Sequence, residues 1–256
     1  PRACEKNREM KSFAKINVFL KVVGTRGNYH EILSRFVLCE QLFDEIYFER
    51  SNSFSIECNN KEIKENIIQK AIDELKKAGF SNELDEFFSS HKIIINKQIP
   101  IGAGLGGGSS NAATFLLMVN DELNLNIKRE NLMQIASKIG ADVAFFVSGY
   151  KAANVSGIGE IIEEFDDEEP NLNIFTPNVF CSTPMVYQEF RSNFLQYIDV
   201  NAAKKMQKLK SKELLEIYKN EELNDLFAPC FKLYPQMNEF RDKFLSGSGS
   251  SVFSVK

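Results

Sequence analysis

The sequence has little of what metal centres, disulfide scaffolds and membrane segments require. Its five cysteines are widely spaced and never form a C-x-x-C pair, and it has only two histidines. We therefore expect reduced thiols that serve mainly in packing, and no structural zinc site. No apolar run approaches the roughly 20 residues of a transmembrane helix, and the first residues lack the apolar segment of a signal peptide. We therefore expect a cytoplasmic location.

Neither sign of charge is in large excess. The chain has 31 Lys and Arg against 35 Asp and Glu, a net charge of -4. Such a balance offers no general attraction to nucleic acid or to an anionic membrane. We expect small-molecule partners, with neither nucleic acid nor membrane, and any phosphate binding must be local.

The sequence has no internal repeat and no low-complexity linker. Its 256 residues, of which 43% are hydrophobic, suit one large domain or two small ones. We expect a flexible lead at 1–10, a first domain at 11–157 and a second at 158–256. The boundary lies beside residues 160–169, where seven of ten positions are acidic, a composition typical of a solvated turn.

Hydrophobic periodicity predicts a mixture of strands and helices. Residues 14–23 alternate as a strand does, which puts Lys15 and Asn17 on one face. Because strands and helices follow without regular βαβ alternation, the pattern predicts an α+β fold. The other expected strands are at 32–38, 45–49, 54–57, 171–176 and 251–255. Helices are expected at 67–75 and 114–125, with another that ends at Gly140 and several within 201–243. Turns are expected at 24–28 and 182–184.

A glycine-rich segment is the most informative feature of the chain. Five glycines fall within the seven residues 102–108, between the apolar run 93–95 and the helical pattern at 114–125. Glycine permits positive-φ turns that aim successive backbone N–H groups inward, and the following helix adds its positive dipole end. The segment therefore predicts a phosphate-binding loop.

Spacing excludes two common phosphate loops. A P-loop needs a Lys before the Ser or Thr, and none precedes Ser109 or Ser110. Gly102, Gly104 and Gly107 fit G-x-G-x-x-G, but a dinucleotide-binding fold needs a second strand soon after the helix. Here the sequence continues with a turn and another helix.

What remains, Pro-x-x-x-Gly-Leu-Gly-x-x-Ser-Ser, resembles the ATP loop of the GHMP kinases. The longer Gly-Leu-Gly-Gly-Gly-Ser-Ser-Asn-Ala-Ala form is similar to one branch, the diphosphocytidyl-methylerythritol kinases of non-mevalonate isoprenoid biosynthesis. The resemblance implies a two-domain fold, with an N-terminal domain of the ribosomal protein S5 domain 2-like type and a ferredoxin-like C-terminal domain. It also implies an ATP-dependent kinase that uses Mg²⁺ and phosphorylates the 2-hydroxyl of the cytidine substrate.

The same resemblance implies roles for individual residues. Residues 12–20 resemble the first motif and 139–143 the acidic one, which makes Asp142 the general base and Lys15 its partner. Ser109 and Ser110 could cap the helix, bind phosphate or, for Ser110, ligate Mg²⁺. The ATP-binding residues expected from the resemblance are Asn66, Lys97, Pro100, Gly102, Gly104, Leu105, Gly106, Gly107, Gly108, Ser109, Ser110 and Asn111.

The acceptor site is expected from shorter matches. Residues 26–30 resemble the Arg-x-Asp-Gly-Tyr-His of the branch but lack its Asp-Gly, and residues 183–187 resemble a segment that supplies a second aromatic. A cytosine would stack between Tyr29 and Tyr187, with His30 on its polar edge. Residues 246–250 resemble the third motif, and the full set of expected substrate-binding residues is Asn17, Tyr29, His30, Tyr187, Gly247, Ser248 and Gly249.

Two other functions fit parts of the pattern. One is a GHMP kinase acting on another small alcohol, such as homoserine or mevalonate, which would lack the cytosine platform. The other is a nucleotide-binding module without catalysis, although the presence of both Lys15 and Asp142 favours an enzyme. We expect a monomer or a weak homodimer.

Overall fold

The computed structural model describes residues 9–61, 66–168 and 170–256, which divide into two compact units. The first unit holds the chain up to Ala14 with Glu40–Ile99 and Gly107–Gly149, and the second holds Lys15–Cys39, Pro100–Gly106 and Tyr150–Lys256. The expected lead at 1–10 lies outside the described residues except for its last two, and the boundary at 157 stays a prediction. No helix of the described ranges has the length and apolar character that crossing a bilayer requires.

The strands of both units are labelled in chain order. They are β1 Met10–Arg26, β2 Tyr29–Arg50, β3 Ile56–Cys58, β4 His91–Asn96, β5 Ala152–Gly157, β6 Ile161–Glu164, β7 Leu172–Phe175, β8 Phe244–Leu245 and β9 Val252–Val255.

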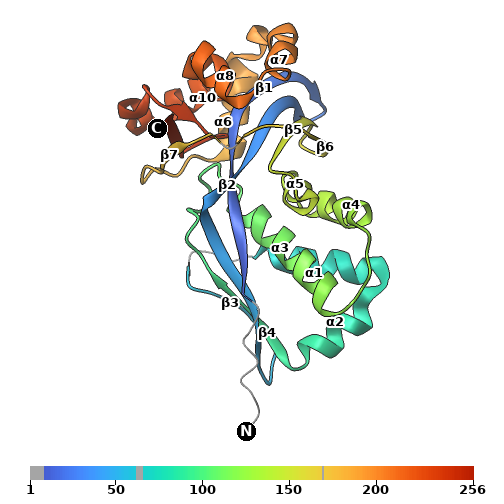
Figure 1. Cartoon of the computed structure of the whole chain (residues 1–256). Helices are drawn as coiled ribbons and strands as arrows, with labels where there is room; N and C mark the ends of the chain where they lie inside the picture. The colour runs from blue at the N-terminus through green and yellow to red at the C-terminus, as the bar shows by residue number, and fades with distance from the viewer. Residues whose placement is uncertain (1–8, 62–65, 169) are drawn as a thin grey trace. The chain divides into compact units, whose positions relative to one another are not determined.

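The α-helices are labelled in the same way (Figure 1). They are α1 Ile67–Leu75, α2 Ser81–Phe88, α3 Gly107–Glu122, α4 Arg129–Ile139, α5 Val143–Ser148, α6 Thr183–Asn193, α7 Val200–Met206, α8 Ser211–Ile217, α9 Asn220–Leu223 and α10 Phe227–Leu233. A π-helical turn at Lys76–Phe80 and 3-10 turns at Leu195–Tyr197 and Pro235–Phe240 complete them.

The first unit packs α1 to α5 against a small sheet (Figure 1). The second half of β2 pairs antiparallel with β4, from Glu45 opposite Asn96 to Arg50 opposite His91, and β4 pairs parallel with β3. Helices α1 and α5 both pack against α3 and α4. The helix expected at 67–75 is confirmed as α1, and Gly79, with φ of 105°, lies in the π-helical turn that follows it. Gly140 likewise follows the last residue of α4, as predicted.

The second unit contains two groups of strands with α6 to α10. The first half of β2 pairs antiparallel with β5, and β5 with β6, while β7, β9 and β8 form a separate antiparallel sheet. The strands expected at 171–176 and 251–255 are therefore confirmed as β7 and β9. Mixed strands and helices also confirm the α+β class.

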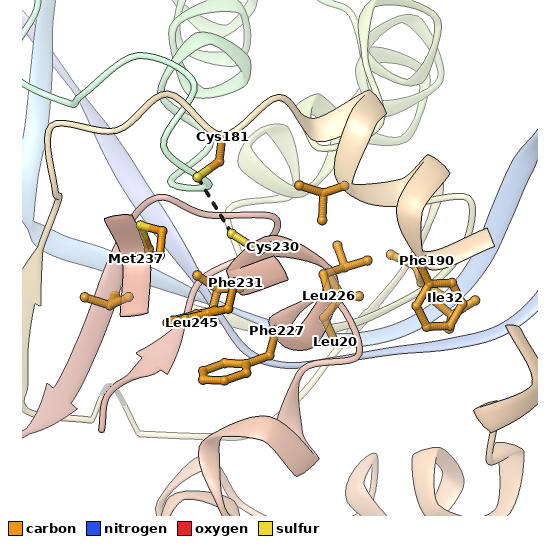
Figure 2. Packing of buried hydrophobic residues seen from close by; sticks show 13 residues of the cluster. Leu20, Ile32, Cys181, Phe190, Leu226, Phe227, Cys230, Phe231, Met237 and Leu245 are labelled. Carbon is orange, nitrogen blue, oxygen red and sulfur yellow. Dashed lines mark hydrogen bonds between the residues drawn. The ribbon is translucent and has the colours of Figure 1, made fainter. Parts of the chain in front are cut away.

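The core of the second unit gathers side chains from β1, β2, α6 and α10 (Figure 2). Phe227 and Phe231 of α10 stack with ring centroids 4.1 Å apart, and both are buried. Cys181 and Cys230 lie in the same core as free thiols with sulfur atoms 3.7 Å apart. Cys39 and Cys58 are also free, so reduced thiols are confirmed for the four cysteines of the described chain.

Three expected boundaries were wrong. The strands expected at 32–38 and 45–49 are one strand, β2, because no glycine or proline between 29 and 50 interrupts it. The turn expected at 182–184 is the start of α6, where Pro184 is tolerated because first-turn N–H groups have no helical partner. Helix α3 begins at Gly107, so Ser109 and Ser110, which were expected to cap it, lie inside its first turn.

The acidic segment is not simply a solvated turn. The Asp167 side chain is 3% exposed and accepts a hydrogen bond of 2.8 Å from the fully buried guanidinium of Arg35 on β2. Arg35 also donates to the side chain of Asn154 and to two main-chain carbonyls, and it lies 3.4 Å from the centre of the Phe165 ring. A buried charge requires such a complete set of partners. Asp167 therefore fixes the segment to the sheet.

We expect Asp167→Asn to lower the free energy of unfolding by about 3–5 kcal/mol, because it leaves the Arg35 charge buried without a carboxylate. Urea unfolding followed by circular dichroism measures the loss. The control is Asp85→Asn, which breaks an exposed ion pair with Lys76 and should cost less than about 1 kcal/mol. Equal losses for both variants would contradict the structural role of Asp167.

Candidate active site

The glycine loop has the backbone conformation that the sequence predicts, but only in its first part. Gly102, Gly104 and Gly106 have φ of 63°, 77° and 70°, which side-chain-bearing residues rarely adopt. Gly107 and Gly108 instead belong to the first turn of α3. A Cβ at Gly107 would lie 2.8 Å from a methyl group of Ile99, so this position needs glycine for space rather than for its φ.

Lys15 and Asn17 lie on the same face of β1, as predicted. The Lys15 ammonium donates to Asn17 Oδ1 at 2.5 Å and to the Gly104 carbonyl at 3.0 Å, and both side chains are buried. The Lys15 backbone N–H donates to the Leu105 carbonyl at 2.9 Å. In the second unit, β1 thus lies directly against the glycine loop and directs a cation toward it.

The second small-residue loop, 246–250, packs on the same place. The Ser246 hydroxyl donates to the Gly104 carbonyl at 3.0 Å and accepts the Asn17 N–H at 3.2 Å. A Cβ at Gly247 would lie 3.4 Å from Gly104 Cα, so both loops need glycine where they meet. Ser248 lies 2.6 Å from the hydroxyl of Thr183 at the start of α6, oxygen to oxygen.

In the first unit, a buried polar network surrounds the start of α3. Ser110 is 1% exposed and its hydroxyl accepts from Ser12 at 2.8 Å. Asn111 donates to Ser12 at 2.9 Å and to Asp44 at 2.8 Å, and Lys97 donates to Asn111 at 3.1 Å and to Asp44. Three predicted ATP-binding residues therefore share one network.

Three further predicted segments of the first unit meet around Ile67. The Ile67 side chain lies 3.8 Å from the Cβ position of both Gly108 and Gly140. Asn66 precedes it and caps α1, because its side chain accepts the Ile68 N–H at 3.0 Å. Asp142 follows Gly140 at the start of α5 and is half-buried. The pairing of Asp142 in the first unit with Lys15 in the second stays a prediction.

The predicted base platform is assembled in part within the second unit. The rings of His30 on β2 and Tyr187 on α6 stack with centroids 5.0 Å apart, while Tyr29 is 65% exposed. Arg191 of α6 donates to the carbonyls of Gly27 and Tyr29, which holds the turn against the helix. His30 covers one face of Tyr187, so a base could stack only on what remains of that ring.

His30 has two properties that point to a ligand. Its Nε2 is buried and has no hydrogen-bond partner among the described residues. Burial, and next the charge of Arg191, lower the pKa of His30 below its ordinary value, so the ring is neutral at pH 7. A neutral imidazole with an unsatisfied nitrogen can bond the polar edge of a base.

Several residues of these networks were missed from the sequence. Asp44 lies in no predicted motif, and Asn224 donates to the Gly247 carbonyl from 23 positions away. Ser12, Thr183 and Ser246 lie inside predicted motifs but were not assigned a role of their own. Most of their partners lie far along the chain, and the sequence pattern carries no information about such pairs.

Comparisons with known proteins agree with these features. Residues 66–150 match the model of the GHMP kinases N terminal domain. A 4-diphosphocytidyl-2-C-methyl-D-erythritol kinase of Campylobacter jejuni subsp. jejuni serotype O:6 is 48% identical, over 96% of this chain and 99% of the relative. That of Sulfurimonas denitrificans is 41% identical over 96% of both.

Among solved structures, a crystal structure of 4-(cytidine 5'-diphospho)-2C-methyl-D-erythritol kinase superimposes with a TM-score of 0.75. It shares 28% identity and covers 96% of this chain and 89% of its own. Identity at this level over nearly the whole chain, together with the shared fold, establishes the kinship that the glycine loop suggests. The chain therefore belongs to the 4-diphosphocytidyl-2-C-methyl-D-erythritol kinases, a branch of the GHMP kinases.

Proposed function

We propose that this chain transfers the γ-phosphate of ATP to the 2-hydroxyl of 4-diphosphocytidyl-2-C-methyl-D-erythritol, which gives the 2-phosphate and ADP. The observation that carries the proposal is the meeting of two small-residue loops at Gly104, beside the Lys15 ammonium. Phosphoryl transfer needs a held triphosphate, a positioned alcohol and neutralised charge, with little covalent work by the protein.

The ATP triphosphate would be held mainly by main-chain amides. Positive φ at Gly102, Gly104 and Gly106 would let main-chain N–H groups of the loop turn toward a phosphate, and the start of α3 would add the positive end of its dipole. Lys97, an expected ATP ligand, is 5% exposed and paired with Asp44. Lys97 would therefore hold the loop in place through Asp44 as well as contact the nucleotide.

Mg²⁺ fits the site as an ion carried by the phosphates. The described residues contain no cluster of three or more His, Cys, Asp or Glu that could hold a metal, and Mg²⁺ commonly keeps few protein ligands beside substrate phosphates. The Ser110 hydroxyl at the start of α3 would be its protein ligand. When bound, the ion neutralises charge on the transferred phosphoryl group.

In this proposal Asp142 would take the proton of the acceptor alcohol, and Lys15 would be its partner cation. A nearby cation keeps a carboxylate ionised and therefore able to accept a proton. Lys15 is already oriented by Asn17 and the Gly104 carbonyl, so its ammonium has a defined direction. Asn17, Gly247, Ser248 and Gly249 would line the acceptor side.

The cytidine side is supported by His30 and Tyr187. The unpartnered Nε2 of His30 and the aromatic surface of Tyr187 suit a planar base that offers both a polar edge and a face. A kinase for homoserine or mevalonate would have no use for such a platform. We further propose a cytoplasmic enzyme, monomeric or weakly dimeric, with no nucleic-acid or membrane partner.

The assignment is tested by ATP turnover with three acceptors: the cytidine substrate, homoserine and mevalonate. We expect phosphorylation of the cytidine substrate alone. Turnover of a different alcohol would assign another GHMP activity, and ATP binding without any turnover would indicate a nucleotide-binding module.

Asp142→Asn should lower kcat by about 10²- to 10⁴-fold, because the amide cannot accept the proton of the alcohol. Steady-state kinetics at saturating ATP and cytidine substrate measure the loss. The control is Glu83→Gln, a charge removal at an exposed position of α2, which should keep wild-type rates. Near-normal turnover by Asp142→Asn would remove this residue from the role of base.

Tyr187→Ala should weaken binding of the cytidine substrate by about 10- to 100-fold, because the loss of one base–aromatic stacking contact lowers affinity by about that factor. Affinity for a non-hydrolysable ATP analogue should stay within twofold, and calorimetric titration measures both. Tyr197→Ala removes a 70% exposed aromatic of the same unit and should change neither affinity. A loss of the same size for both ligands would argue against the platform.

Gly104→Ala should abolish measurable ATP binding, because its Cβ would lie 2.1 Å from the Ser246 carbonyl oxygen and φ is 77°. Gly79→Ala is the matched control, since φ there is 105° but no atom lies within 4 Å of the added Cβ. That variant should lose some stability and keep ATP affinity. If Gly104→Ala binds ATP normally, the loop is not the phosphate site.

A further inference from the structure

Asp44 is a buried carboxylate with an unusually complete set of donors. It lies in the middle of β2 and its side chain is fully buried. Its Oδ1 accepts the backbone N–H groups of Gln98 and Ile99 at 2.7 and 2.8 Å. Its Oδ2 accepts from the Lys97 ammonium and, at 2.8 Å, from the Asn111 side chain. Both oxygens are thus satisfied, as a buried charge requires.

These donors come from the two ends of the glycine loop. Residues 97–99 lead into it from β4, and Asn111 is the fifth residue of α3, the helix that begins where the loop ends. All of these residues belong to the first unit. One carboxylate therefore connects the start and the end of the segment that would hold the triphosphate.

The connection continues to the helix start itself. Asn111 accepts from Lys97 at 3.1 Å and donates to Ser12 at 2.9 Å, and Ser12 donates to Ser110 at 2.8 Å. Asp44 thus orients Asn111, and through Ser12 it orients the hydroxyl of Ser110. Ser12, Asp44, Ser110 and Asn111 are buried and the Lys97 side chain is only 5% exposed, so solvent competes little with these bonds.

We propose that Asp44 is a positioning residue for ATP: it holds both ends of the glycine loop in the conformation that binds the triphosphate. The inference rests on the proposed function, because it assumes that the loop is the ATP site. Glycines make the loop flexible, and ordering a flexible backbone on binding costs affinity. Fixing both ends beforehand removes part of that cost.

The test is Asp44→Asn, which keeps the shape of the side chain. An amide can still accept the two backbone N–H groups through its oxygen, but its NH₂ group then faces the donors of Lys97 and Asn111. We expect the Kd of a non-hydrolysable ATP analogue to rise about 10- to 100-fold, while the Kd of CDP stays within twofold. Calorimetric titration of the full chain measures both.

Hydrogen exchange separates positioning from general destabilisation. In Asp44→Asn we expect faster exchange at amides 98, 99 and 107–111, with rates in the second unit unchanged. The control is Asp225→Asn, which breaks the buried pair with Lys21 in the second unit and should lower stability without a selective loss of ATP affinity. Folded Asp44→Asn that binds the ATP analogue like wild type, or loses ATP and CDP affinity equally, would overturn the proposal.

A second variant covers the case in which Asp44→Asn does not fold. Ser12→Ala removes one link between Asn111 and Ser110, and we expect ATP affinity to fall by about 2- to 10-fold with CDP affinity unchanged. Unchanged ATP affinity in Ser12→Ala would then refute the proposal. Failure of the wild-type protein to bind the ATP analogue would instead refute the proposed function, so the two failures are distinguishable.

Discussion

The Gly104 carbonyl is the point on which the site in the second unit depends. It accepts from the Lys15 ammonium at 3.0 Å and from the Ser246 hydroxyl at 3.0 Å, so β1, the glycine loop and the C-terminal small-residue loop meet at one oxygen. Any Cβ at this position would collide with the Ser246 main chain. The glycine that lets the backbone turn is therefore also what lets the second loop approach.

Features that depend on near neighbours were predictable from the sequence. Alternation along β1 placed Lys15 and Asn17 on one face, and the bond between them confirms it. Helical spacing located α1, Gly140 located the end of α4, and glycine spacing located three positive-φ residues. These patterns have periods of two to four residues, so a single sequence is enough to reveal them.

Features that depend on distant partners were not predictable. Asp44 and Arg35 look like surface charges in an alternating pattern, yet both are buried because Lys97 and Asp167, far along the chain, neutralise them. The same applies to the acidic segment, where only one of the six described acidic residues, Asp167, pairs with the buried Arg35. A turn composition indicates solvent exposure on average and cannot identify the member that has a buried cation as its partner.

The placement of these ion pairs limits how the protein can bind a triphosphate. Lys97, Arg35 and Lys21 each lie beside a buried or nearly buried carboxylate, so much of the interior positive charge is already balanced, and the net charge of the chain is negative. In the proposed ATP site, attraction for phosphate would then come largely from main-chain amides and a helix dipole, which act only at short range and in the correct geometry. Specificity for ATP would thus depend on backbone conformation, and in the proposed role the buried carboxylate of Asp44 favours anion binding because it fixes that conformation.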